Sequence, residues 1–240
     1  MKQAITLFVS LLMLTGTILA QKTIRDANAQ NRNGLKNFNS IQVSSGIDLY
    51  LTQSPEEAVA VSASTEEYRN KIITEVVDGV LKIYYEKKNG WNWSLHGGNK
   101  KLKAYVSVKN LDRLSASGGS DVSLETAIRS NRLSISLSGG SDLKGEIQCD
   151  EFSLSASGGS DANIKGKTSQ AKINASGGSD VNGYALITDV CKVVSSGGSD
   201  VSITANKQMD ANASGGSDIR YKGNATVTTS KSGGSGIRKL

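Results

Sequence analysis

The chain has almost no proline: Pro55 is the only one among 240 residues, whereas 26 are glycine. Glycine without proline excludes a collagen triple helix. Aromatic residues make up 5% and apolar residues 37% of the sequence, which is low for an ordinary globular domain. The apolar fraction is nevertheless too high, and the net charge of +6 too small, for a disordered chain. These absences leave a folded chain that is rich in turns.

Histidine and cysteine are also scarce. His96 is the only histidine and has no partner at the spacing of a catalytic pair. The two cysteines, Cys149 and Cys191, fall at different points of the repeat described below, so their Cα atoms are expected to lie too far apart for a disulfide. Their spacing fits no zinc motif. We therefore predict two free thiols, with Cys191 in the core, and no catalytic residues, metal site or cofactor.

Long apolar runs are confined to the N-terminus. Lys2, the apolar run at 5–14 and Ala20 predict a signal peptide at residues 1–20. We expect an exported protein, in the periplasm, on the outer surface or outside the cell, with no transmembrane segment after cleavage. The positive charges are scattered and not interleaved with aromatic residues, so no nucleic-acid partner is expected.

One pentapeptide, Ser-Gly-Gly-Ser-Asp, dominates the sequence after residue 116. It occurs six times, and a seventh copy at 232–236 ends in Gly236. Its aspartates are 18 to 21 residues apart, at Asp121, Asp142, Asp161, Asp180, Asp200 and Asp218. A repeat near 19 residues is too short for a helix pair or a propeller blade and suits one coil of a β-solenoid.

Between the copies, apolar residues recur at fixed distances from each aspartate and alternate with polar ones, as in strands. Seven residues before the aspartates stand Leu114, Ile135, Leu154, Ile173, Val193 and Ala211. The predicted fold is all-β: a single-stranded right-handed parallel β-helix (β-solenoid) of about eight to ten coils. The paired glycines permit positive φ at a corner, and serine and aspartate can hydrogen-bond to turn backbone. The aspartates are therefore interpreted as a structural corner repeat.

We predict an N-terminal linker at 21–34 and one solenoid domain at 35–240. The domain divides into irregular coils at 35–112 and regular repeats at 113–240. In the irregular part, residues 65–71 read as one helical turn, and 73–77 and 81–85 as strands around a tight turn. This irregular start is expected to cap the stack.

Both tryptophans lie in a glycine-flanked segment that fits no coil. Trp91 and Trp93 are the predicted ligand-binding residues, because exposed aromatic rings can stack on sugars or anchor a protein partner. The alternative is that they pack over the first coils, since tryptophan is usually mostly buried. The partner is expected to be a glycan or a protein at the cell surface.

The order of these features resembles a family of exported bacterial proteins named "Putative auto-transporter adhesin, head GIN domain". The resemblance rests on residues 38–51, on residues 74–83 and on the Ser-Gly-Gly-Ser-Asp ladder. It implies a single-stranded right-handed β-helix with an export signal and a role in adhesion. It carries no catalytic or ligand residues to transfer to this chain.

Two alternatives to a non-catalytic module remain. A cation-binding repeat protein would need more ligands than one carboxylate per coil, because Ca²⁺ takes six to eight oxygens. Stacked aspartates about 4.8 Å apart would instead repel, unless turn amides, lysines or loosely held cations offset the charge. A carbohydrate-active enzyme on a β-helix would need a unique cluster of carboxylates in a groove. The sequence therefore favours an exported non-catalytic module that is adhesin-like or structural.

Overall fold

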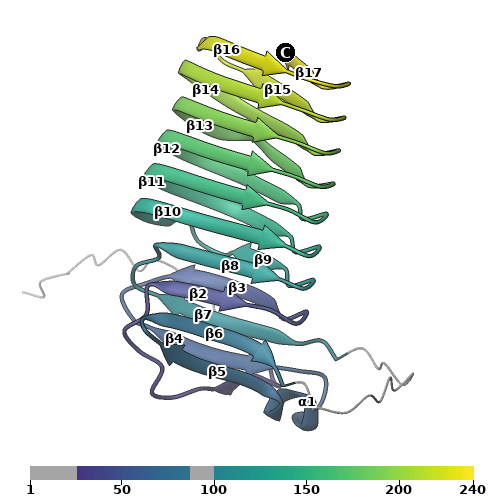
Figure 1. Cartoon of the computed structure of the whole chain (residues 1–240). Helices are drawn as coiled ribbons and strands as arrows, with labels where there is room; N and C mark the ends of the chain where they lie inside the picture. The colour runs from purple at the N-terminus through teal and green to yellow at the C-terminus, as the bar shows by residue number, and fades with distance from the viewer. Residues whose placement is uncertain (1–25, 87–99) are drawn as a thin grey trace, which may run out of the picture.

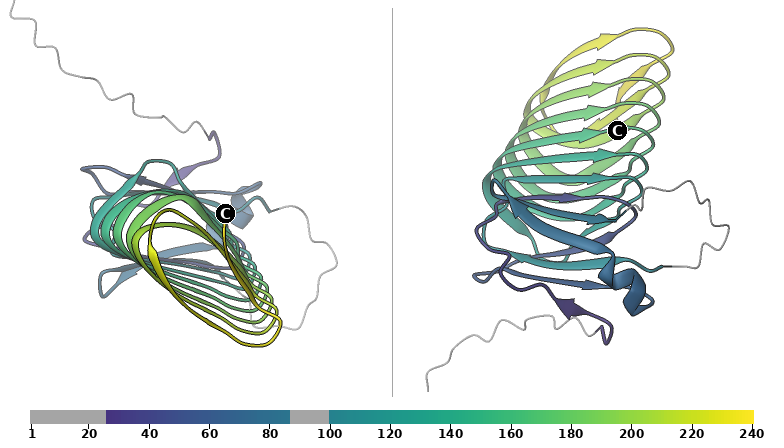
Figure 2. Two further views of the ribbon diagram at one scale, coloured as in Figure 1. Left: turned by 90° about the horizontal axis from the view of Figure 1, so that it is seen from above. Right: turned by 60° about the horizontal axis from the view of Figure 1, so that its bottom comes forward.

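The computed structural model describes residues 26–86 and 100–240. In this part of the chain, 17 strands form one curled sheet, accompanied by a single-turn helix, α1 (Glu66–Asn70). The sheet winds into a β-solenoid of about seven turns with a spacing near 19 residues, seen as stacked coils in Figures 1 and 2. The predicted fold class is confirmed. The expected eight to ten coils were too many, because much of residues 54–86 forms antiparallel strands and the short helix.

The regular coils stack in parallel register. Leu133 pairs with Phe152, and Leu154 with Ile173. The longest strands bend at corners and so contribute to more than one face of the solenoid. The strands of this part are β8 (Arg113–Ser117), β9 (Val122–Leu124), β10 (Ile128–Ser138), β11 (Leu143–Ala156), β12 (Ala162–Ala175), β13 (Asp180–Ser195), β14 (Asp200–Ala213), β15 (Asp218–Lys222), β16 (Thr226–Lys231) and β17 (Gly236–Lys239).

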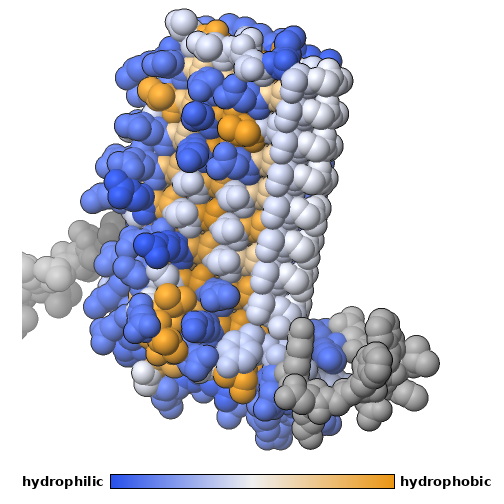
Figure 3. All heavy atoms as spheres, in the orientation of Figure 1, coloured by the Kyte–Doolittle hydropathy of each residue, from blue (hydrophilic) through white to orange (hydrophobic). Residues whose placement is uncertain are grey.

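The Ser-Gly-Gly-Ser-Asp corners form a pale band along the right edge of Figure 3. Gly158 and Gly177 have φ of +68° and +75°, the left-handed conformation that glycine adopts without a steric cost. The second serine of each motif points inward. The backbone N–H of Ser120 donates to Ser141 Oγ at 3.1 Å, and that of Ser141 to Ser160 Oγ at 3.2 Å. Buried hydroxyls thus join neighbouring coils at the corner.

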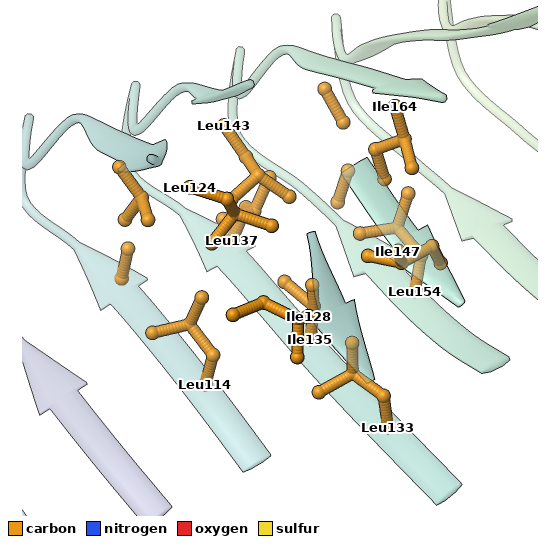
Figure 4. Packing of buried hydrophobic residues seen from close by; sticks show 14 of the residues in the cluster. Leu114, Leu124, Ile128, Leu133, Ile135, Leu137, Leu143, Ile147, Leu154 and Ile164 are labelled. Carbon is orange, nitrogen blue, oxygen red and sulfur yellow. The ribbon is translucent and has the colours of Figure 1, made fainter. Parts of the chain in front are cut away.

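The apolar columns fill the interior. All six residues of the column from Leu114 to Ala211 are buried. Figure 4 shows Leu114, Ile135 and Leu154 on successive strands with their side chains in the core. Both cysteines are buried free thiols, as predicted, and burial raises the pKa of Cys191 to about 12.

The N-terminal coil lies between two later coils. Strand β2 (Ser40–Val43) pairs in parallel with β6 (Val80–Tyr85) on one side and β8 on the other. Likewise, β3 (Asp48–Gln53) lies between β7 (Lys103–Val108) and β9. The first coil is therefore internal, and the coil of β6 and β7 lies nearer the end of the stack.

Antiparallel strands finish this end. Strand β4 (Ala58–Ser62) pairs with β7, and β5 (Ile72–Val77) pairs with β6. Asp78 and Gly79 have φ of 50° and 75°, as the predicted tight turn requires. The antiparallel pairs replace the parallel edge that another coil would otherwise extend.

The described part of the predicted linker is attached to the sheet. Strand β1 (Gln30–Asn31) pairs antiparallel with β4. The Tyr105 hydroxyl donates to the carboxylate of Asp26 at 2.7 Å. The predicted signal peptide at 1–20 and the predicted ligand residues Trp91 and Trp93 lie outside the described residues.

Candidate functional site

The structure brings the six predicted corner aspartates into one column. The backbone N–H of Asp161 donates to the Asp142 carboxylate at 3.2 Å, and that of Asp180 to the Asp161 carboxylate at 3.2 Å. Equivalent bonds join Asp142 to Asp121 and Asp218 to Asp200. Hydrogen bonds to a carboxylate favour its charged form. Turn amides therefore offset the repulsion that the stacking creates.

Asp48 extends this column by one coil. Leu49 pairs with Val122, which places Asp48 next to Asp121. Burial and, secondarily, the charge of Asp121 raise the pKa of Asp48, while Lys103 opposes the shift.

A groove of about 500 Å³ follows the column from Asp48 to Asp180. Tyr50 lines its N-terminal end and stacks on Tyr105, with ring centroids 5.2 Å apart. The carboxylates repeat along the groove, so no single pair is set apart as a general acid and a nucleophile would be. Within residues 26–86 and 100–240, no group of three or more His, Cys, Asp or Glu is placed to hold a metal ion. The groove can attract cations but does not assemble an oxygen cage.

The strands of the regular coils stack in three parallel rows. One row runs through β8, one runs through β9, and the third starts at Ile128–Ser130, the first part of β10. It continues through residues 147–149 of β11 and 166–168 of β12. The coil before it takes a shorter path, since only residues 109–112 connect β7 to β8. The open edge of the new row is covered by Gln53. Its side-chain amide donates to the Arg129 carbonyl at 2.9 Å and accepts from the Arg129 N–H at 2.7 Å, as a neighbouring strand would.

A hollow of about 1200 Å³ lies where the third row begins. We call it the basic hollow. Its charged lining consists of Arg113, Arg129, Arg132 and Lys167, with Asp112 and Asp150. Amides and hydroxyls complete it: Asn39, Asn110, Asn131, Gln148, Ser130, Ser134 and Ser169, beside Cys149. In Figure 3, the left edge of the surface, where the strands of the visible face begin, is mostly hydrophilic.

The four cations differ in how they are paired. Arg132 forms an ion pair with Glu151 at 2.8 Å, and this hydrogen bond and charge raise the pKa of Arg132 and lower that of Glu151. Arg129 Nε donates to Gln148 at 3.2 Å. Neither Arg113 nor Lys167 forms a side-chain ion pair within the described part of the chain. Arg129 also lacks an ion pair in this part of the chain, so its charge too is available to an anionic ligand. Arg113 and Lys167 are the two cations whose side chains make no hydrogen bond there either.

Sequence reasoning did not find the basic hollow. Its lining comes from residues 39–169, and no short motif links them. Two signals were present in the repeat. Asp112 lies nine residues before Asp121, whereas the residues nine before the later aspartates, such as Leu133 and Phe152, are apolar. The interval from Asp121 to Asp142 is 21 residues, the longest of the series. Both departures lie next to the point where the third row begins.

Residues 37–225 match the family described as "Putative auto-transporter adhesin, head GIN domain". The chain belongs to this family. The resemblance predicted from residues 38–51, residues 74–83 and the Ser-Gly-Gly-Ser-Asp ladder is thus confirmed.

Solved structures show the same fold for this head GIN domain protein. A putative adhesin from Bacteroides fragilis is 22% identical, with 90% of this chain and 98% of that chain covered and a TM-score of 0.80. A putative adhesin from Parabacteroides merdae is 17% identical, with 90% and 97% covered and a TM-score of 0.67. A putative lipid binding protein from Parabacteroides distasonis is 22% identical, with 90% and 98% covered and a TM-score of 0.67. No curated protein matches the chain.

Within its described residues, the head GIN domain protein has no helix with the length and hydropathy needed to cross a bilayer.

Proposed function

We propose that this chain is an exported, non-catalytic binding module with an adhesin-like role at the bacterial cell envelope. The observation that carries the proposal is the family match over residues 37–225. The predicted signal peptide at 1–20 supports export. The final location is the periplasm, the outer surface or the extracellular space.

The exposed faces support binding to an extended partner. On one face, short polar side chains recur at the same position in successive coils, such as Ser115, Ser136 and Ser155, which the strand register aligns. A ligand with its own repeat can make the same weak contact many times, which raises avidity. A glycan chain and a regular protein surface both meet this requirement, and the regular polar face also suits a scaffold.

The column of aspartates supports a structural role over catalysis. A glycosidase assigns different roles to two carboxylates in different environments. Most members of this column instead accept the same hydrogen bond from the next coil. We therefore assign the column to the corner and place binding elsewhere on the surface.

The test is a binding screen of residues 21–240 on an array of glycans and extracellular proteins, with and without calcium. Reducing-end release from each bound glycan is measured in parallel, and cell fractionation locates the full chain. We expect reproducible, calcium-independent binding without release, and recovery outside the cytoplasm. Turnover of a bound glycan would favour the enzyme alternative, and strict calcium dependence the cation-binding alternative. Silence on the whole array would refute the binding role and leave a scaffold.

A further inference from the structure

We propose that the basic hollow binds a segment of a carboxylate-bearing polysaccharide. This inference rests on the proposed binding function and names its site and ligand class. The hollow collects four cationic side chains and two carboxylates, so it carries an excess of positive charge. Guanidinium groups recognise carboxylates through paired, directional hydrogen bonds.

The cations come from three strands at different levels along the solenoid axis. Arg113 belongs to β8, Arg129 and Arg132 to β10, and Lys167 to β12. Strands β8, β10, β11 and β12 are successive neighbours on the sheet. Three interstrand steps span about 14 Å. A basic surface that extends over this length suits a polymer with an acid group on successive units better than it suits one small anion.

The uncharged lining matches sugar hydroxyls. Asn39, Asn110, Asn131 and Gln148 surround the charges, and each amide side chain both donates and accepts hydrogen bonds. The lining residues of the hollow include no aromatic side chain, so they offer no platform for stacking of single-stranded bases. Apart from Cys149, every lining side chain is polar or charged, so the hollow lacks the apolar side chains against which a lipid chain packs. A polar, acidic, extended ligand is the class that these groups recognise.

The location of the hollow makes it distinct from the repeated surface. It forms where residues 109–112 connect β7 directly to β8 and where β10 starts the third row of strands. The Gln53 amide fixes the backbone of Arg129 at this step. Arg129 is thereby held by main-chain contacts, and its side chain is oriented by Gln148. Part of the site is therefore organised before any ligand arrives.

The experiment measures binding of residues 21–240 to polygalacturonate by biolayer interferometry, with neutral dextran and duplex DNA as comparison probes. The test variant is Arg113→Gln/Lys167→Gln. The matched control is Lys231→Gln/Lys239→Gln, which removes the same charge from exposed lysines of β16 and β17. Since a hydrogen bond to a charged group is worth about 1.5–3 kcal/mol, we expect the test variant to lose roughly tenfold to a hundredfold in affinity. The control should lose no more than about threefold, as expected for screened surface charge. The charge-preserving Arg113→Lys/Lys167→Arg variant should retain most of the binding, and an unchanged Tm of the test variant shows that its hollow is still folded.

Equal losses in the test and control variants would overturn the inference, because net charge would then explain the binding. Equal affinity for duplex DNA would also overturn it, since the site would recognise any polyanion. Array hits without polygalacturonate binding would refute the inference and leave the proposed function intact. If the protein bound neither the array nor polygalacturonate, both the inference and the proposed binding function would be refuted.

Discussion

Glycine can be required at a position by a positive φ or by a lack of space for a Cβ, and three glycines of the solenoid differ in these two respects. At Gly178, φ lies outside the left-handed region and an added Cβ would meet nothing within 4 Å. At Gly159, φ is +77° but the space is also open. At Gly166, φ is +122° and the Cβ would lie 2.0 Å from the Ile147 carbonyl oxygen. Replacing each by alanine therefore tests a different term.

The expected costs form a graded series. Gly178→Ala should be neutral or stabilise by about 0.4–1 kcal/mol, because alanine restricts the unfolded chain. Gly159→Ala should cost about 1–2 kcal/mol for the left-handed conformation. Gly166→Ala adds an overlap that requires the Ile147 carbonyl to retreat by about 1.4 Å to reach ordinary contact. Overpacking costs about 1–3 kcal/mol, and the paired Ile147 and Gly166 would lose backbone hydrogen bonds worth about 0.5–1.5 kcal/mol each. With the backbone strain, Gly166→Ala should cost roughly 3–6 kcal/mol.

Urea unfolding followed by far-UV circular dichroism measures this series. The m-value must be compared as well as the midpoint, because a solenoid can lose its coils in separate steps. Coincident midpoints for Gly159→Ala and Gly178→Ala would refute the argument from φ. A wild-type midpoint for Gly166→Ala would show that the coils do not approach as closely as the structure indicates.

Four further outcomes are expected. Because the pKa of Asp48 is raised above 3.8 by burial, its ionisation opposes folding as pH rises; Asp48→Asn should raise Tm at pH 7, and a gain that persists at about pH 3 would contradict this. Gln53→Ala should lower the free energy of unfolding by about 1 kcal/mol through its lost edge contacts, and an unchanged urea midpoint would contradict it. Cys191, with its pKa raised to about 12, should resist iodoacetamide at neutral pH in the folded protein and react in urea; rapid labelling without urea would show that the thiol is accessible. Trp91→Ala/Trp93→Ala should weaken binding to an array hit without lowering Tm, whereas a large stability loss would favour the packed alternative.

The regular half of the fold was predictable because every coil must bury its apolar side chains in the same way. Leu114, Ile135 and Leu154 keep one distance from the corner aspartate, and only a parallel stack buries all of them. The glycine pairs supplied the corner conformation, and Gly158 confirms it with φ of +68°. The inward direction of the second serine of the motif was harder to predict, because a serine in a turn can form hydrogen bonds with backbone groups whether it points inward or outward.

The order of the N-terminal coils was not predictable from the same patterns. Strand β2 alternates as an inward-facing strand should, with Ile41 and Val43 buried. Alternation assigns a face to each side chain but does not choose the neighbouring strand. Both sides of β2 present equivalent backbone groups, and only the assembled stack places β6 on one side and β8 on the other.

The candidate site illustrates the opposite relation between sequence and structure. A perfect repeat carries information about stacking, because every coil must meet the same packing and hydrogen-bonding demands. Such a repeat cannot by itself distinguish one coil as a binding site. The distinguishing features here are departures from it: Asp112 in an apolar column, the 21-residue interval before Asp142 and the polar Gln53 at a strand edge. These departures all lie next to the point where the third row begins and the basic hollow forms. The residues of the hollow are therefore not determined by the stacking and hydrogen bonding that determine the repeated corners.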